Sequence, residues 1–576
     1  MTTTPGGFLL VLAVLLPLVG VLSGLVFGGR NAQRIALAII VVGLGIAVAI
    51  ANAFLKSGDA VVYLLGGWAP PLGIALRADG LSVVMLLAIA VVISGIGLYA
   101  CADFSTPAGT REARAPVSFW MLLLAVWGSL NLVFVSGDLF TLYVALELLT
   151  FAGVPMVCLD GRGETLRAAL RYLLFALGGS ILYLLGVVLL YGAYGTLDIV
   201  LLGARIQPEP VAWVAAALMT VGLLAKTALF PLHLWLPPAH AGAPAAASAV
   251  LSALVIKGSW FLVVRLWFDV MPGVVTLQSA QLLAALGAAV IVIGSVVALR
   301  QQRLKLLVAY STLAQIGYLF LMFPLAFDAG GSLVHGAALT GGMLQAISHA
   351  TAKAAMFMAA GLIYTALGHD RISELGGIAR AQPVAVLAFA LGGLALMGIV
   401  PSGAYLAKKL LLQAADGSGQ WWWTVVLQGG AVFTAGYVVL VLYRALRRGP
   451  QPITPKAPVS RLSEVAALAL AVCSLLLALA TLGPVPQDLL SNPLAPSELW
   501  TTLWVILGGA LLAMGLGQRA PAADGVVTSE NPVRRVTVAI GEMFVCVDGV
   551  LRRWPVAGLS LLALSLLFIA AMWVSR

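Results

Sequence analysis

Charged side chains are scarce in this chain of 576 residues: they make up only 9% of it, whereas 61% of the residues are hydrophobic. The mean hydropathy is +1.06. A soluble protein of this length needs far more charge to cover its surface. Apolar runs of about 20 residues, the length that crosses a hydrocarbon core of ~30 Å, recur along almost the whole sequence. We therefore predict an all-α integral membrane protein of about sixteen transmembrane helices.

Cysteine is also rare, and its spacing excludes several kinds of site. The four cysteines are Cys101, Cys158, Cys473 and Cys546, and none forms a CxxC motif or a Cys/His cluster. This spacing indicates no iron–sulfur site, no zinc site and no disulfide framework. We expect no metal, no cofactor and no redox centre in the chain. The first apolar run has no preceding Lys or Arg, which is untypical of a secretory signal, so residues 5–27 are interpreted as a retained first span.

The basic residues predict the orientation of the spans. With the connections numbered by the spans they join, the odd connections hold 22 of the 32 Lys and Arg and the even ones hold 4. The positive-inside rule then places the odd connections in the cytoplasm and both termini on the non-cytoplasmic side of the cell's inner (plasma) membrane. The net charge of +10 is therefore interpreted as a topology signal, and no nucleic-acid partner is expected.

Several lysines lie inside predicted spans, where each costs roughly 2.5–3.5 kcal/mol to insert. Lys226, Lys257 and Lys353 are several residues from the ends of their spans, so they fit poorly with side chains that reach back to the membrane surface. A side chain that reaches to the membrane surface is the alternative for Lys408, and the position of Lys409 fits this alternative well. Buried ionisable groups in membranes are functional by default, and the first three lysines are therefore candidate ion-translocation residues.

Glu147 is the one carboxylate well inside a span. An isolated buried carboxylate takes up a proton and an isolated buried lysine loses one, whereas pairing keeps both charged. A pair of Glu147 with a buried lysine is therefore a candidate switch, because opening it releases a proton. A purely structural ion pair is the alternative.

Three histidines are candidate proton relays because imidazole titrates near neutral pH. His349 is the best placed, since it lies one helical turn before Lys353 on the same face. His240 follows a pair of prolines, where it is a candidate for a cytoplasmic entrance, and His335 is the third. A lone histidine is more often a hydrogen-bonded packing residue, which is the alternative for each.

Prolines at two spans predict helix breaks. Pro231 lies directly after the span that ends near residue 230, and Pro401 lies in the middle of the span over residues 382–411. A mid-helix proline frees a backbone carbonyl, which is tolerated in lipid only beside protein or water. A simple packing kink is the alternative at each position.

The C-terminal part contains a polar stretch, Gln518–Asn531, followed by an amphipathic segment near 532–553. Apolar residues such as Val536, Ile540 and Val547 share one helical face, while charged residues including Asp548 are assigned to the other. This pattern predicts a helix lying on the cytoplasmic membrane surface. An ordinary loop helix is the alternative.

These residues resemble the antiporter-like subunits shared by respiratory complex I, membrane-bound hydrogenases and multisubunit sodium/proton antiporters. The longest motif is Lys226-Thr-Ala-Leu-Phe-Pro-Leu-His-Leu-Trp-Leu-Pro-Pro-Ala-His240, which continues to Lys257. Further matching segments are 136–147, 303–318, 348–353 and 401–408. The resemblance as a whole covers residues from about 80 to 450.

The resemblance implies two inverted five-helix repeats, over 116–268 and 276–444, each with one broken helix, the seventh and the twelfth span. An N-terminal three-helix segment covers 1–115, and C-terminal helices cover 463–576. It also implies an ion path. Ions would enter by a half-channel to Lys226, switched by Glu147, continue through Lys257 and Lys353, and leave by Lys408. A second lysine follows directly, so the exit residue is left open between Lys408 and Lys409.

The favoured function is that of a proton or sodium/proton translocating subunit of a multisubunit membrane complex. Its expected partners are other membrane subunits and the lipid bilayer, and its expected ion is H⁺, with the choice between H⁺ and Na⁺ left open. The parent complex could be an NADH:quinone oxidoreductase or a hydrogenase. The alternatives are an ion-conducting subunit that energises uptake of bicarbonate or another anion by a partner, and a membrane scaffold without transport. A quinone-reducing catalytic subunit is a weaker third alternative.

Overall fold

Long apolar helices account for most of the chain in the computed structural model, which describes residues 2–107, 113–328, 330–449, 453–479, 495–517 and 532–574. Within these residues, 13 helices are long and apolar enough to cross a membrane, and two shorter apolar helices cover Pro383–Leu396 and Trp500–Leu516. The predicted helical membrane fold is confirmed, while the count of sixteen spans stays a prediction. The polar stretch Gln518–Asn531 lies outside the described residues.

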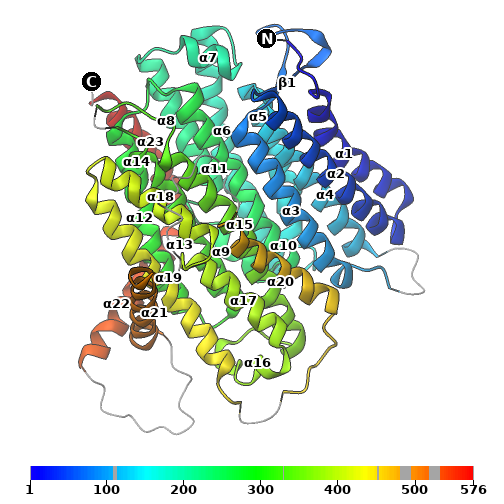
Figure 1. The fold of residues 1–576 in the computed structure, drawn as a ribbon, viewed down its shortest axis with the longest axis vertical. Helices are drawn as coiled ribbons and strands as arrows, with labels where there is room; N and C mark the ends of the chain where they lie inside the picture. Colours follow the sequence, from blue (N-terminus) through cyan, green and yellow to red (C-terminus); the bar gives the residue numbers. More distant parts are fainter. Residues whose placement is uncertain are drawn as a thin grey trace. The chain divides into compact units, whose positions relative to one another are not determined.

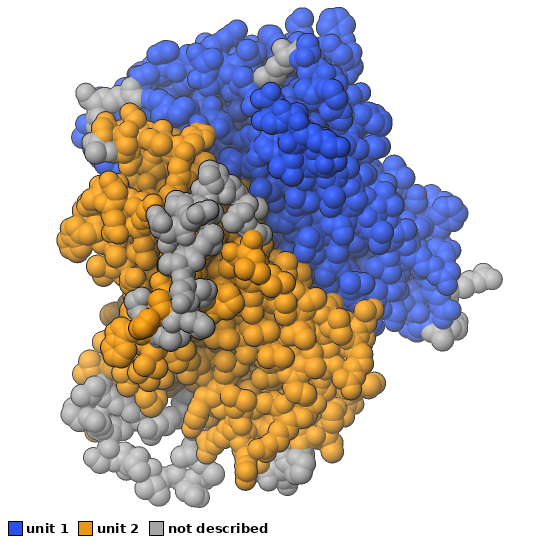
Figure 2. All heavy atoms as spheres, in the orientation of Figure 1, with its two compact units in different colours: residues 1–228, 242–282, 559–576 blue, residues 229–241, 283–558 orange. Residues whose placement is uncertain are grey.

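The chain divides into two compact units, which Figure 2 shows in blue and orange. The first contains residues 1–228, 242–282 and 559–576, and the second contains 229–241 and 283–558. Because the segment 229–241 belongs to the second unit, the chain leaves and re-enters the first unit around the first predicted helix break. The inverted repeats remain a prediction.

The first unit begins with a group of helices that Figure 1 shows side by side in blue and cyan, α1 to α4. Its elements are α1 (Phe8–Phe27), α2 (Gly29–Ser57), β1 (Val61–Leu64), η1 (Leu65–Gly67), β2 (Ala75–Ala78), α3 (Gly80–Asp103), α4 (Arg114–Val135), α5 (Leu139–Val157), α6 (Gly163–Tyr194), α7 (Ile199–Arg205), α8 (Pro210–Thr227), α10 (Ala245–Val250), η2 (Leu251–Val255), α11 (Ile256–Arg265) and η3 (Leu266–Val270). The last helix of the chain, α23 (Trp554–Trp573), contributes most of its length here.

A short antiparallel hairpin of β1 and β2 departs from the predicted all-helical fold. Val61 pairs with Ala78 and Leu64 with Ala75. The run Val61–Leu64 is rich in β-branched and aromatic residues, which favour extended structure. The sequence pattern predicted a plain connection here, because two four-residue strands give too short a signal to stand out between long apolar runs.

The second unit contains the rest of the helices. They are α9 (Leu236–Gly242), α12 (Leu277–Leu299), α13 (Leu304–Phe320), α14 (Met322–Leu325), α15 (Ala337–Leu367), η4 (Ile372–Glu374), α16 (Ile378–Ala381), α17 (Pro383–Leu396), α18 (Gly403–Gly417), α19 (Trp421–Leu446), α20 (Arg461–Leu476), α21 (Pro496–Leu516) and α22 (Pro532–Leu551). Helix α18 packs on α15 through a buried apolar cluster that includes Leu344, Leu406 and Leu410. Lys408 of α18 and Gln345 of α15 line the same small cavity beside this contact.

Both prolines that predicted helix breaks lie in non-helical segments. Pro231 lies between α8, which ends at Thr227, and α9, which begins at Leu236. Pro401 lies between α17 and α18, so the predicted span 382–411 is two helices with a gap between them. Backbone groups at such gaps need partners other than the helix itself. The gaps therefore mark places where polar side chains or water can reach the interior.

Candidate functional site

An ion pair joins the half-buried Glu147 of α5 to the buried Lys226 of α8. The Lys226 Nζ lies 3.1 Å from Glu147 Oε1 and donates to Thr150 Oγ1 at 2.7 Å. Ser180 of α6 donates its hydroxyl to the same carboxylate oxygen. Lys226 is only 7% exposed. The carboxylate and the ammonium therefore have the partners that two charges need when they are taken out of water.

Close packing of α6 and α8 makes this pair possible. A Cβ atom on Gly179 of α6 would lie 2.7 Å from the carbonyl oxygen of Gly222 of α8, and one on Gly222 would lie 2.3 Å from that of Gly179. Small residues let two backbones approach in this way within a membrane. Lys226 lies one turn after Gly222, and Ser180 directly follows Gly179, so both side chains are brought to Glu147.

Lys257 lies at the start of α11, just after the π-helical turn η2. It is 1% exposed, and its Nζ donates to the carbonyl oxygen of Ser252 at 2.9 Å. A π-turn widens the helix locally, and such turns are frequent at functional sites. The side chain is therefore held inside the first unit by a backbone acceptor within the irregular turn.

Lys353 occupies the corresponding interior of the second unit, on α15. It is fully buried, and its Nζ donates to the Ser311 hydroxyl and to the carbonyl oxygen of Val308 at 3.4 Å. In the described part of the chain it forms no ion pair with a carboxylate. His349 and Gln345 precede it at intervals of four residues, so the three side chains form a polar stripe along α15.

A string of buried amides and hydroxyls continues from this stripe. Gln345 donates to Gln315 of α13 at 3.3 Å. Gln315 donates in turn to Thr434 at 3.1 Å and to Tyr437 at 3.3 Å, both on α19. Such groups can accept and donate hydrogen bonds in either direction, so they can orient water along a path.

The three candidate relay histidines occupy different environments. His240 of α9 is fully buried and stacks on Phe357 with ring centroids 4.8 Å apart. Among the described residues, neither of its ring nitrogens has a hydrogen-bond partner, although buried polar groups normally do. His349 is also fully buried, whereas His335 is exposed in the connection between α14 and α15. The relay hypothesis therefore depends on His240 and His349.

The two lysines of α18 differ in their contacts. Lys409 Nζ lies 2.8 Å from Glu498 Oε1 of α21 and 4.9 Å from the ring centre of Tyr405. Lys408 forms no ion pair within the described ranges, but its side chain lines two adjoining cavities. Glu498 was not predicted from the sequence, since about ninety residues separate it from the lysines along the chain.

A cluster around His233 was also not predicted, although this histidine lies inside the longest motif. His233 Nε2 lies 2.9 Å from Asp548 Oδ1 of α22, and Tyr310 donates its hydroxyl to Asp548 Oδ2 at 2.8 Å. Arg552 Nε lies 2.8 Å from the same oxygen. Burial alone would raise the pKa of Asp548, but His233, Arg552 and Tyr310 together lower it.

This cluster shows where Asp548 lies, which the amphipathic pattern left open. The pattern placed Asp548 off the apolar face, and the structure shows that it is only 1% exposed. Instead the apolar residues Val536, Ile540 and Val547 are between 39% and 59% exposed. The Asp548 carboxylate points inward because three polar partners surround it there. The apolar residues of α22 are left exposed and can contact another surface.

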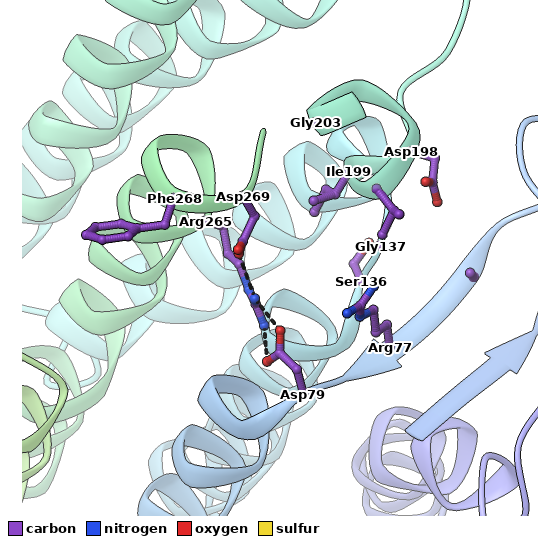
Figure 3. Close-up of a pocket in the computed structure, with 12 residues that line it drawn as sticks. Arg77, Asp79, Ser136, Gly137, Asp198, Ile199, Gly203, Arg265, Phe268 and Asp269 are labelled. Atoms are coloured by element: carbon purple, nitrogen blue, oxygen red, sulfur yellow. Dashed lines mark hydrogen bonds and ion pairs between the residues drawn. The ribbon is translucent and has the colours of Figure 1, made fainter. Parts of the chain in front are cut away.

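A further polar cavity of about 280 Å³ lies at the ends of several helices of the first unit. Figure 3 shows Arg265 of α11 between Asp79, which caps α3, and Asp269. The guanidinium is 2.5 Å from Asp79 and 2.8 Å from Asp269. Burial would raise the pKa of Asp79, but the Arg265 charge and hydrogen bond lower it to about 2. This ion-pair cluster therefore stays charged at any physiological pH.

The fold and these sites define a helical membrane protein with buried charges beside interrupted helices. A family model described as "NADH:quinone oxidoreductase/Mrp antiporter, TM" matches residues 136–434, which is more than half of the chain. The chain belongs to this family. The resemblance drawn from the sequence motifs is therefore confirmed, and the match includes Glu147, both ends of the predicted lysine row and the two helix breaks.

Individual relatives come from several kinds of complex. The chain is 32% identical over 466 residues to NADH-quinone oxidoreductase subunit N of Desulforudis audaxviator, covering 79% of this chain and 90% of the relative. It is 29% identical over 415 residues to a Na(+)/H(+) antiporter subunit of Alkalihalophilus pseudofirmus, covering 71% and 80%.

Two solved structures have a similar fold. A chain of the Mrp complex from Dietzia sp. matches with a TM-score of 0.73 and 23% identity, covering 89% of this chain and 97% of that one. A chain of the membrane-bound sulfane sulfur reductase, an archaeal respiratory membrane complex, matches with a TM-score of 0.72 and 24% identity, covering 88% and 99%. The chain thus has the fold of a subunit of multisubunit membrane complexes.

Proposed function

We propose that this chain is an ion-translocating subunit of a multisubunit membrane complex, which moves protons, or exchanges Na⁺ for protons, through its buried charges. The observation that carries the proposal is the Glu147–Lys226 pair, a half-buried carboxylate and a buried lysine on helices that are apolar enough to span a membrane. Intramembrane ionisable residues are expensive and are kept for function. The relatives, whose names include an NADH-quinone oxidoreductase subunit and a Na(+)/H(+) antiporter subunit, support the same proposal.

The proposed switch works by separating the pair. While Glu147 lies beside Lys226, both remain charged, because each offsets the cost of burying the other. When the carboxylate moves away, burial favours the neutral amine, and Lys226 gives up a proton. Thr150 and Ser180 hold the closed state through hydrogen bonds, which the opening must break.

The proposed path continues through Lys257 and Lys353 and leaves by α18. Each lysine accepts and releases a proton in turn, with His240, His349 and buried water as relays. Moving one charge against the membrane potential costs about 2.3 kcal/mol per 100 mV. That energy comes from a partner's redox reaction or from the gradient of an exchanged ion, which is why we propose partner subunits in the plasma membrane.

The other functions considered have less support. An ion-conducting subunit that energises anion uptake would use the same row of charges, but no relative reported above has a name that points to such uptake. A scaffold without transport would be expected to lose its buried charges first, because each is costly in lipid. Lys226, Lys257 and Lys353 are all present and all buried, and Glu147 is present as the partner of Lys226.

The test is ion flux through the whole complex, purified by a tag on this chain and placed in proteoliposomes with a pH-sensitive dye inside. We expect Glu147→Gln and Lys226→Ala each to reduce flux driven by a pH gradient or by the partner's reaction by about tenfold or more, because each leaves a buried charge without its partner. Repeating the measurement with and without Na⁺ distinguishes proton transport from sodium/proton exchange.

The matched controls are Glu164→Gln and Lys56→Ala, which change exposed residues of the same types. Both should conduct like the unmodified complex. Unchanged flux in assembled Glu147→Gln and Lys226→Ala complexes would rule out the switch. If those two variants fail to assemble while the controls assemble, the pair is structural.

A further inference from the structure

The carboxylate of Glu498 lies beside the two lysines with which the proposed ion path ends. It belongs to α21, in the C-terminal part of the chain, whereas the lysines belong to α18. A cavity of about 130 Å³ is lined by Lys408, Lys409 and Glu498 together with the polar side chains of Gln428, Thr501 and Thr502. All of these groups belong to the second unit.

Close packing fixes α21 in this place. A Cβ atom on Gly509 of α21 would lie 2.5 Å from the side chain of Ala435 of α19. Gly508 likewise leaves room for Val432. Glu498 lies in the first turn of α21, where the helix dipole favours a negative charge. The carboxylate is therefore held by the fold at the side of α18.

The two lysines relate differently to this carboxylate. Lys409 forms the ion pair with Glu498 at 2.8 Å and lies over the Tyr405 ring, so its charge is fixed by two neighbours. Lys408 lines the cavity that contains Glu498 and also a smaller inner cavity lined by Gln345 and Tyr318. It is thus the lysine that connects the polar stripe of α15 with the carboxylate.

The cavity also has a group that is suited to water. The side-chain oxygen of Gln428 is buried and has no hydrogen-bond partner among the described residues. Buried polar atoms without a protein partner are usually satisfied by ordered water. A water at this oxygen would lie in the same cavity as the lysines and Glu498.

We propose that Glu498 is the proton-exchanging carboxylate at the end of the path, that Lys408 is the lysine that delivers the proton, and that Lys409 is a fixed counter-charge. In this step an N–H bond of the Lys408 ammonium breaks and an O–H bond forms on the Glu498 carboxylate, directly or through water. Lys408 is left as a neutral amine. The carboxylic acid then gives its proton to outside water and pairs again with Lys409.

This inference rests on the proposed function and assigns the exit that the sequence left open. The predicted topology agrees with it, since the connections that precede α19 and α21 are both even and are both expected on the non-cytoplasmic side. The titratable groups that face Glu498 from α18 are Lys408, Lys409 and Tyr405.

The experiment compares variants of the whole complex in the same proteoliposomes. We expect Glu498→Gln to reduce flux by about tenfold or more, because the amide cannot take up the proton. Glu498→Asp should keep part of the flux, and Lys409→Arg should keep most of it, because arginine preserves the fixed positive charge without being able to release a proton.

The control is Asp416→Asn, which changes an exposed carboxylate on α18. Normal flux in Glu498→Gln, or an equal loss in Lys409→Arg and Glu498→Gln, would overturn the inference, the second because it would mean that Lys409 also has to release its proton. If the unmodified complex conducts and Glu147→Gln blocks it while Glu498→Gln does not, this inference alone fails. A complex that conducts nothing in its unmodified form overturns the proposed function.

Discussion

At the scale of single residues, the buried lysines can be tested by keeping their charge and removing their ability to release a proton. Lys257 and Lys353 are each almost completely buried. Arginine stays protonated at any working pH, so it can replace a fixed positive charge but cannot relay a proton. We expect Lys257→Arg and Lys353→Arg to block proton flux as completely as the alanine variants, measured in proteoliposomes containing the whole complex.

The control for these variants is Lys56→Arg, at an exposed position where the charge alone should suffice. Loss of proton flux, whichever way the pH gradient is imposed, would show that each lysine lies on the conducting path. Near-normal flux in both arginine variants would instead mean that these lysines act as fixed charges that tune the path.

The residues that could be predicted from the sequence are those whose signal is local. Glu147, Lys226, Lys257 and Lys353 are conspicuous because a charge inside an apolar run is rare. Glu498, by contrast, lies in the first turn of a helix, where a carboxylate is ordinary. Its relation to Lys409 depends on how α21 packs on α19, and the pattern of one segment contains no information on that packing.

At the scale of elements, helix α22 shows the same limit. Its amphipathic pattern predicted the helix, but the sequence could not show which polar residue turns inward, since the partners of Asp548 are 315 and 238 residues away. The β1–β2 hairpin was missed because its strands are only four residues long. Long apolar helices, in contrast, have a signal in the composition of a single segment, so most of them could be predicted.

Asp548→Ala tests the role of α22. The substitution leaves the buried His233 and Tyr310 without the acceptor they contact, at a cost of about 1–3 kcal/mol. We expect α22 to loosen, the melting temperature of the detergent-solubilised complex to fall, and partner subunits to dissociate on a native gel. Deleting 532–553 should have the same effect in stronger form.

Flux through those complexes that stay intact should change little, because we propose that α22 serves assembly more than conduction. The matched control is Glu542→Ala, which removes a carboxylate of the same helix that is 68% exposed. A complex with unchanged melting temperature and unchanged partner content in Asp548→Ala would contradict the proposal.

At the scale of the whole molecule, connections of the same kind meet within each unit: even connections contact even connections, and odd connections contact odd ones. In the first unit, the cavity around Arg265 is lined by Asp79, Ser136, Asp198 and Asp269, which lie in or next to four successive even connections. In the second unit, Arg303 of one odd connection pairs with Asp370 of the next at 3.0 Å. A miscounted span would bring odd and even connections together. The contacts around Arg265 and between Arg303 and Asp370 therefore support the predicted alternation of spans.

The topology can be tested with single cysteines. Gly163 lies in an odd connection and Gly273 in an even one, and a side chain at either position meets open space. With the four native cysteines replaced, we expect an impermeant maleimide to label Gly163→Cys only from the cytoplasmic side and Gly273→Cys only from the outside. A reporter fused after Arg576, which lies outside the described residues, should likewise be external, because an even number of spans returns the chain to its starting side. Labelling of both cysteines from one side, or a cytoplasmic reporter, would mean that the spans are miscounted.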